Sequence, residues 1–261
     1  MRIASLQMNM KFACPDENFG KAERLIRDAA KSGADTVLLP ETWNVGFFPR
    51  ENLKELADVD GKRTKMFFSS LAKELNINIV AGSVANLKND KVYNTCFVFD
   101  RKGNLVAEYD KTHLFTPMGE DNYFEKGDRF VTFELDGKKC SVIICYDIRF
   151  PELTRSITTK GLDYLFVVSQ WPKVRTLHLK TLAQARAIEN QMFLAYCNSC
   201  GVAGETVYGG NSMIFGPWGD VLAEAGDSEQ IIFADCDESI LKDIRETINV
   251  FRDRRPEIYS I

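Results

Sequence analysis

The sequence predicts an α/β protein, a four-layer α-β-β-α sandwich in which two packed sheets lie between two layers of helices. Short apolar or alternating runs recur along the whole chain, and amphipathic helical patterns lie between several of them. The 261 residues include no low-complexity tract and no linker rich in proline, glycine or serine. We therefore expect a single domain over residues 1–261.

The first strand–helix–strand unit has the clearest pattern. Residues 2–8 alternate as a strand does, and Pro15 opens a helix whose apolar side chains recur every three or four residues. Gly33 ends this helix. Residues 36–39 form a short, continuously apolar run, which is typical of a strand buried on both faces.

The rest of the chain continues with hairpins and further helix–strand units. Further helices are expected at 64–75, from Pro151, at 176–190 and at 238–247. Further strands are expected at 78–82, 91–99, 104–110, 129–135, 138–144, 163–168, 192–199, 209–215, 221–225 and 230–236. These elements fit two sheets with helices outside both. Residues 248–261 are expected to form an extended tail.

Charge and cysteine content limit the partners and the compartment. The net charge of −4 argues against a nucleic acid or an anionic membrane as partner. The chain starts with an alternating pattern rather than a charged leader, and no stretch approaches the ~20 apolar residues of a membrane span. Seven cysteines is an odd number, and several lie in apolar strand-like runs. Reduced thiols, and so a cytoplasmic location, are the simplest expectation.

Three polar side chains come directly after predicted strands. They are Glu41, Lys111 and Cys145. Ligand sites of α/β sheets lie beyond the carboxyl ends of strands, so these three could meet in one pocket. A thiol, a cation and a carboxylate are what acyl transfer needs without histidine. The thiolate attacks, the cation keeps it ionised and polarises the carbonyl, and the carboxylate carries the proton.

The segments around these residues resemble the three signature blocks of the nitrilase, or carbon–nitrogen hydrolase, superfamily. Those blocks are 38–41, 109–115 and 144–152, and their order and spacing match. Further similar segments are 185–191, 210–212 and 217–220. The resemblance therefore runs from the first strand almost to the C-terminus.

The resemblance implies hydrolysis of a non-peptide carbon–nitrogen bond through a cysteine thioester. It implies that Cys145 attacks, that Glu41 takes the thiol proton and later activates water, and that Lys111 stabilises the tetrahedral intermediate. A second glutamate of the family falls on Glu120, where it would position the cluster and assist proton transfer. The backbone N–H of Tyr146 would complete the oxyanion hole.

The same resemblance bears on partners and assembly. It implies a small amide and water as the only reactants, with no cofactor and no metal ion. Family members usually form homodimers with crossing C-terminal tails, so residues 248–261 are a candidate dimer contact.

A further motif bears on the substrate. Residues 169–172, followed by Arg175, resemble the ω-amidase branch, whose members hydrolyse the terminal amide of α-keto acid amides such as α-ketoglutaramate. Arg175 could bind the free carboxylate of such a substrate, or could simply cap or pair with the next helix. Trp171 and Tyr208 are further candidates for substrate contact. The alternatives within the superfamily are an N-carbamoyl amine amidohydrolase and a nitrilase.

Several nearby residues have a structural interpretation. Asp147 and Arg149 are expected to pair and to hold the turn after Cys145, and Glu152 could join them. His113 is expected to make structural hydrogen bonds.

Two functions of another class remain open. One is a non-catalytic scaffold. The other is a thiol redox protein that uses Cys197 and Cys200, which form a C-x-x-C motif. No second cysteine pair or nearby histidine completes a zinc set, so we favour buried thiols for these two.

Overall fold

Two mixed β-sheets pack against each other in the computed structural model, which describes residues 1–159 and 161–259. The first sheet has the order β15 (Gln230–Asp235), β1 (Arg2–Gln7), β2 (Thr36–Leu38), β4 (Asn78–Lys88), β5 (Lys91–Phe99) and β6 (Leu105–Asp110), with β3 (Asp58–Val59) beside β4. The second has the order β14 (Val221–Glu224), β13 (Met213–Phe215), β10 (Phe193–Asn198), β9 (Tyr164–Ser169), β8 (Lys138–Ile144) and β7 (Thr132–Leu135). A hairpin of β11 (Cys200–Ala203) and β12 (Thr206–Gly209) stands apart.

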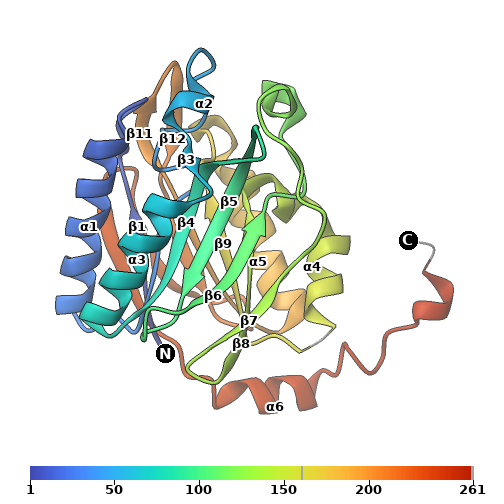
Figure 1. Cartoon of the computed structure of the whole chain (residues 1–261). Coiled ribbons are helices and arrows are strands. Elements are labelled where there is room, and N and C mark those ends of the chain that lie inside the picture. The colour runs from blue at the N-terminus through green and yellow to red at the C-terminus, as the bar shows by residue number, and fades with distance from the viewer. Residues whose placement is uncertain (160, 260–261) are drawn as a thin grey trace.

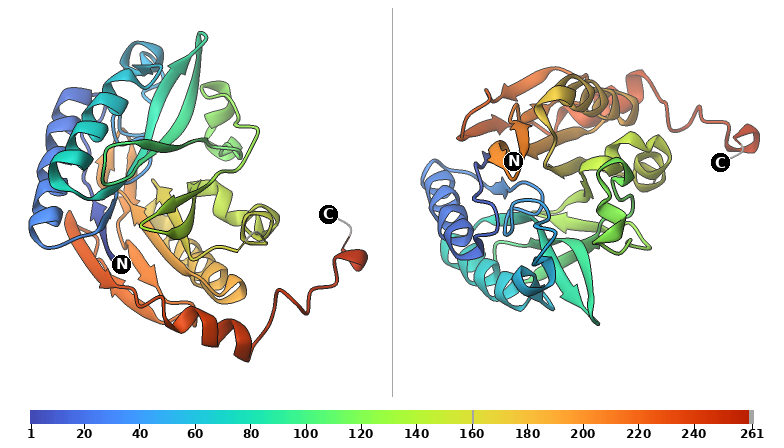
Figure 2. Two further views of the ribbon diagram at one scale, coloured as in Figure 1. Left: turned by 60° about the horizontal axis from the view of Figure 1, so that its bottom comes forward. Right: turned by 90° about the horizontal axis from the view of Figure 1, so that it is seen from above.

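Helices cover the outer face of each sheet (Figures 1 and 2). On the first sheet lie α1 (Pro15–Lys31) and α3 (Lys62–Leu75), and on the second lie α4 (Pro151–Thr158) and α5 (Thr176–Asn190). Each buries an apolar side: Ala22 and Ile26 of α1 join the core of the first sheet, and Leu179 and Ala183 of α5 join that of the second. The predicted α-β-β-α sandwich is confirmed.

Parallel strands bring the ends of both sheets to one side of the molecule. Strands β1, β2 and β4 run parallel, as do β8, β9 and β10. Strand β6 is antiparallel to β5, which is antiparallel to β4, so β6 points the same way as β4. The Glu41 N–H, just after β2, donates to the Ser169 carbonyl at the end of β9 at 3.3 Å. This bond joins the carboxyl ends of the two sheets.

The predicted strand over 209–215 is wrong. Residues Gly210 and Asn211 have φ of +58° and +55°, which breaks the chain into β12 and β13. The break is held from β1, because the Gln7 side-chain oxygen accepts the Ser212 N–H at 2.9 Å. The β11–β12 hairpin, the short helix α2 (Leu53–Leu56) and β3 were not predicted, and β4 extends well beyond residue 82.

The C-terminal tail also differs from its prediction. Helix α6 (Ile240–Thr247) ends the sandwich, and the following residues run away from it (Figures 1 and 2). The tail is not simply extended, because residues 250–253 turn and Pro256–Ile258 form a 3-10 helix. The fixed φ of proline favours such a first turn. Residues 260–261 of the predicted tail lie outside the described residues.

Candidate active site

Glu41, Lys111 and Cys145 meet where the carboxyl ends of β2, β6 and β8 converge. The Lys111 Nζ donates to Glu41 Oε1 at 2.7 Å, and Lys111 and Cys145 line the same cavity. Both carboxylate and ammonium are fully buried, and Cys145 is 8% exposed. The residues predicted from strand ends are therefore brought together as expected.

Glu120 completes the cluster from the loop that follows β6. It lies in a 3-10 turn, Glu120–Asn122, and its two oxygens contact Lys111 Nζ at 2.9 and 2.8 Å. The Phe115 N–H fixes Glu120 Oε2 at 2.6 Å. An ammonium has three N–H donors, so Glu41 and Glu120 engage all of them in this structure.

Sequence reasoning missed two partners of Glu41. The Asn94 side-chain amide on β5 donates to Glu41 Oε1 at 2.9 Å and to Glu120 Oε1 at 3.2 Å. The Gln170 backbone N–H donates to Glu41 Oε2 at 2.9 Å. Gln170 lies in the segment 169–172 that suggested the substrate class, whereas Asn94 lies in mid-strand and gave no signal.

The backbone at Cys145 is an elbow. Cys145 has φ of +50°, an unusual conformation for a residue other than glycine, and it opens a 3-10 turn, Cys145–Arg149. Tyr146 is the second residue of this turn, and the first N–H groups of a helical turn have no acceptor within it. The thiol and the Tyr146 N–H thus belong to the first two residues of the same turn.

From the sequence, a cation is expected to keep the Cys145 thiol ionised, and the surroundings of the thiol in the structure have the opposite effect. Burial raises the pKa of the thiol well above its ordinary value, the charge of Glu41 raises it further, and Lys111 only partly opposes them. These shifts favour a neutral thiol at rest over an ionised thiolate held by Lys111. A base has to take its proton as it attacks.

The other two groups shift in ways that the cluster explains. Burial alone lowers the pKa of Lys111, but the charges of Glu120, Glu41 and Cys145 outweigh it, so its pKa lies above the ordinary value. Burial raises the pKa of Glu120, and Glu41 adds to this, while Lys111 opposes it. Lys111 is thus held as a cation, and the site carries more carboxyl groups than cations.

The predicted pair of Asp147 and Arg149 is wrong. Asp147 does hold the turn after Cys145, but its partners are the Tyr109 hydroxyl at 2.7 Å, the His113 N–H at 2.9 Å and the Ile144 N–H at 2.9 Å. His113 also contacts Asp147 through Nδ1 at 2.8 Å, which confirms its structural hydrogen bonding. Asp147 thus ties the β8 end to the segment after β6. Glu152 is exposed and joins no such network.

A narrow cavity of about 20 Å³ opens onto Cys145 and Lys111. Its other walls are Phe47, Phe115, Met118, Tyr146, Arg149, Gln170, Trp171, Pro172 and Arg175. This volume is far below the usual range of ligand pockets and is close to that of one water molecule. A substrate therefore has to be short, and side chains of the wall have to move to admit it.

Two guanidinium groups line this cavity without an acidic partner among the described residues. Arg149 packs over the Trp171 ring at 4.8 Å and contacts His178 Nδ1 at 3.1 Å. Arg175 packs over the Phe115 ring at 5.0 Å. Ionic partners are usual for partly buried arginines, so both charges remain available to an anion.

The remaining predicted contacts are divided between two cavities. Trp171 lines the Cys145 cavity, and its indole N–H donates to the Arg175 carbonyl at 2.8 Å. Tyr208 instead lines a neighbouring cavity, where its ring lies 6.3 Å from that of Phe47. Tyr208 does not line the Cys145 cavity, and burial raises the pKa of its hydroxyl, with smaller contributions from Glu41 and Cys145.

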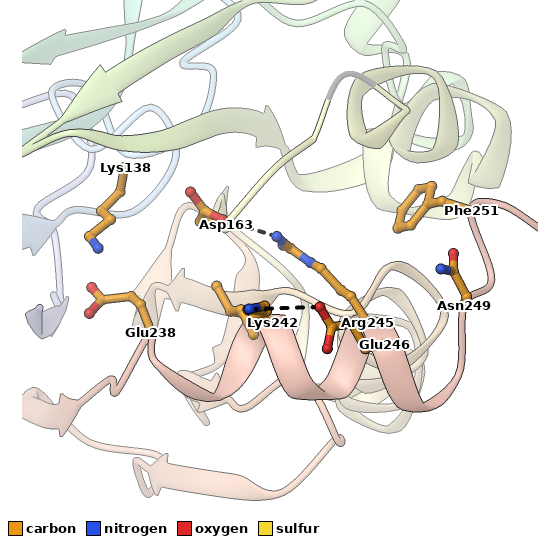
Figure 3. Close-up of a pocket in the computed structure, with 9 residues that line it drawn as sticks. Lys138, Asp163, Glu238, Lys242, Arg245, Glu246, Asn249 and Phe251 are labelled. Atoms are coloured by element: carbon orange, nitrogen blue, oxygen red, sulfur yellow. Dashed lines mark hydrogen bonds and ion pairs between the residues drawn. The ribbon is translucent and has the colours of Figure 1, made fainter.

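A larger cavity at the opposite end of the strands is a poor candidate for chemistry (Figure 3). Lys138, which begins β8, and α6 line it. Its charges are largely paired: Arg245 contacts Asp163 at 3.3 Å, and Lys242 contacts Glu246 at 3.9 Å. It contains no thiol.

The C-x-x-C cysteines are buried thiols, as predicted. All seven cysteines are free. Burial raises the pKa of both Cys197 and Cys200 to about 12, so neither forms an appreciable thiolate near neutral pH. Within residues 1–159 and 161–259, no cluster of three histidine, cysteine or acidic side chains could hold a metal ion. No helix in that part of the chain is long and apolar enough to cross a membrane.

Known proteins resemble the chain over nearly its whole length. A family model described as carbon–nitrogen hydrolase matches residues 2–246. A 2-oxoglutaramate amidase of Bacillus subtilis is 46% identical over 98% of both chains. An omega-amidase of Xenopus tropicalis is 35% identical over 94% of this chain and 92% of its own.

A solved structure extends the comparison to the fold. An amidase of the nitrilase superfamily from Nesterenkonia sp. AN1 is 26% identical, with a TM-score of 0.87 over 99% of this chain and 98% of its own. That structure is of a glutamate-to-glutamine variant in which acrylamide has added to the active-site cysteine.

Proposed function

Because the chain belongs to the carbon–nitrogen hydrolase family, and two unpaired arginines line the cavity at its buried thiol, we propose that it hydrolyses the terminal amide of short dicarboxylate monoamides such as α-ketoglutaramate. The products are ammonia and the dicarboxylate. The single observation that carries the substrate class is the pair of guanidinium groups, Arg149 and Arg175, beside Cys145. The 2-oxoglutaramate amidase among the relatives supports the same choice.

In the first half of the reaction, Cys145 attacks the amide carbonyl while its proton passes to Glu41. The raised pKa of the thiol favours its neutral form at rest, so attack and proton transfer occur together. The oxyanion accepts hydrogen bonds from Lys111 Nζ and the Tyr146 N–H. Glu41 then returns the proton to the leaving nitrogen, the carbon–nitrogen bond breaks and ammonia leaves a thioester on Cys145.

In the second half, Glu41 takes a proton from water, and the resulting hydroxide attacks the thioester. The carbon–sulfur bond breaks, the proton returns to Cys145, and the acid is released. One carboxylate thus serves both halves. At rest, all N–H donors of Lys111 are engaged by Glu41 and Glu120. When Glu41 is protonated, its hydrogen bond with Lys111 weakens. One donor is then free for the oxyanion when negative charge develops there.

A non-catalytic scaffold is disfavoured by the cost of this cluster. Lys111, Glu41 and Glu120 are completely buried, and removal of three ionisable groups from water costs several kcal/mol per ion before their contacts offset it. A fold kept only for partner binding gains little from this arrangement. A redox role for Cys197 and Cys200 is disfavoured by their raised pKa values.

The substrate proposal predicts a preference for anionic amides that depends on Arg175. Ammonia release should be fastest with α-ketoglutaramate or succinamate, and slow with nitriles, N-carbamoyl amines and neutral amides. Arg175→Gln should raise KM for succinamate by roughly 10- to 100-fold, because a charge-assisted bond is lost. KM for a neutral amide such as butyramide should change by less than about threefold. Arg149→Gln should also raise KM for succinamate.

The control for this experiment is Lys173→Gln. Lys173 belongs to the same 3-10 turn as Arg175, pairs with Asp227 at 3.4 Å and does not line the cavity. The variant Lys173→Gln should leave KM for succinamate and KM for butyramide unchanged. Equal rates on nitriles, carbamoyl amines and anionic amides would reject the substrate class, and equal KM changes for charged and neutral amides would reject the role of Arg175.

We also propose that a second copy of the chain covers the C-terminal tail. Ile248, Ile258 and Tyr259 are 50%, 61% and 45% exposed on a segment that leaves the sandwich. Apolar side chains in such a segment gain little from contacts with their own chain and favour burial against a neighbouring molecule.

We further propose a location in the reducing cytoplasm, which the free thiols support. The net charge of −4 disfavours a nucleic acid as partner.

Sedimentation tests the dimer. The full chain should sediment as a dimer. A chain that ends at Thr247 should dissociate into monomers at concentrations at least about tenfold higher than the full chain does. Alanine at Val202 and Val207 provides the control, since these are exposed apolar residues on the β11–β12 hairpin and away from the tail. A full chain that is monomeric throughout, or a truncated chain that dimerises equally well, would contradict the proposal.

A further inference from the structure

Among the described residues, Asn94 is the one neutral side chain that joins both buried carboxylates. Its amide nitrogen lies 2.9 Å from Glu41 Oε1 and 3.2 Å from Glu120 Oε1, and the residue is completely buried on β5. The backbone carbonyl of Asn94 also accepts a hydrogen bond from the backbone N–H of Lys111 at 2.9 Å. Asn94 therefore contacts three members of the cluster through side chain and backbone.

Two like charges that share one ammonium need a second constraint. Glu41 and Glu120 repel each other, and a lysine on a flexible stem fixes neither orientation. The two N–H groups of one carboxamide point in fixed directions, and here each goes to a different carboxylate. Each Oε1 thus receives one hydrogen bond from Lys111 and one from Asn94.

The opposite end of the Asn94 amide supports this orientation. Its Oδ1 is buried and has no hydrogen-bond partner among the described residues. The side chain is therefore held from its nitrogen alone. A flipped amide would face its oxygen toward two carboxylates, which is electrostatically unfavourable.

We propose that Asn94 is a positioning residue that holds Glu41 and Glu120 at the separation and orientation in which Lys111 serves both and Glu41 faces the thiol. It acts through Glu41 and touches neither substrate nor thiol. The inference rests on the proposed role of Glu41 as the base. The ionisable groups that face these carboxylates are Lys111, Cys145 and, at longer range, Tyr208.

The pH profile separates this role from simple packing. N–H donors favour the ionised form of a carboxyl group, so their loss favours the protonated form, which cannot accept the thiol proton. Asn94→Leu should therefore shift the acidic limb of the kcat/KM profile upward by about one pH unit. Near neutral pH, kcat should fall roughly 10- to 100-fold, with KM within about threefold.

Asn86→Leu is the matched control. Asn86 is also fully buried, lies on the adjacent strand β4, and donates to Thr95 at 3.2 Å with its own Oδ1 unpartnered among the described residues. Its replacement should cost comparable stability and leave the acidic limb in place. Asn94→Asp, which keeps the shape and adds a third carboxyl group, should shift the limb further than Asn94→Leu, and it decides the question if the leucine variant fails to fold.

A second readout makes the result independent of the substrate. The rate at which iodoacetamide alkylates Cys145, followed by mass spectrometry of its peptide across pH, should shift in the same direction in both Asn94 variants. If no amide is hydrolysed, the proposed function fails while this readout still tests Asn94. An acidic limb that stays at the wild-type position in both Asn94 variants, whatever the loss of rate, would overturn the proposal.

Discussion

Cys145→Ala should reduce ammonia release from succinamate or α-ketoglutaramate to the background rate, a loss on the order of 10⁵- to 10⁶-fold in kcat. No other thiol is placed to replace it. Cys145 lines the cavity beside Lys111, whereas the other cysteines lie elsewhere in the fold. The substitution removes one sulfur from an elbow that alanine can also adopt, so the fold should persist.

The control for Cys145→Ala is a thiol from the same strand. Cys140 is fully buried on β8, five residues before the elbow, and its sulfur contacts the Lys138 carbonyl at 3.4 Å. Cys140→Ala should keep kcat within about threefold at a modest cost in stability. Substantial ammonia release by Cys145→Ala, with contaminating enzyme excluded, would rule out the thioester route.

Glu41→Gln should lower kcat by roughly 10³- to 10⁴-fold while the cavity keeps its shape. Glutamine is nearly isosteric and can still meet Lys111 through its oxygen, but it cannot accept a proton from the thiol or from water. Both halves of the reaction therefore lose their base. Steady-state ammonia release and thermal unfolding of the same preparation are the measurements.

Glu108→Gln is the matched control for the glutamate. Glu108 lies on β6, three residues before Lys111, and its carboxylate pairs with Lys65 and Lys88, each at 3.2 Å. Its loss removes a carboxylate of the same sheet without touching the cluster and should leave kcat within about twofold. A Glu41→Gln enzyme that retains a tenth or more of the wild-type kcat would show that another group is the base.

Residues at strand ends were the easiest to predict. Glu41, Lys111 and Cys145 each follow an apolar run, and parallel strands carry their ends to one edge whatever the details of packing. Their meeting followed from local pattern and general topology. Glu120 required the family resemblance, because a 3-10 turn in a loop has no periodicity to reveal which of its acidic residues points inward.

Contacts between distant segments could not be predicted. Asn94 lies within an alternating strand, and only the pairing of β5 with β4 and β6 sets it opposite two carboxylates. Asp147 was matched with Arg149 because they are close in sequence. In the fold it meets Tyr109 on β6 and His113 just after that strand instead, which leaves Arg149 facing the cavity.

Backbone breaks and the tail were missed for a related reason. The split between β12 and β13 depends on Gly210 and Asn211 in left-handed conformations, stabilised by Gln7 from the far end of the chain. The strand propensity of residues 209–215 does not reveal the hydrogen bond between Gln7 and Ser212. In the tail, Pro256 initiates a turn that its neighbours do not suggest.

The most direct test of the account is to look for the acyl group on the sulfur. At alkaline pH, where solvent hydroxide can take the thiol proton in place of the missing carboxylate, Glu41→Gln incubated with an activated aryl ester of succinate should acylate slowly and then hydrolyse far more slowly than the wild type. Mass spectrometry should find one succinyl group per chain, on the peptide that contains Cys145, and the wild type should turn the ester over. An adduct on a different residue, or an unmodified Cys145 in a folded variant, would contradict the account.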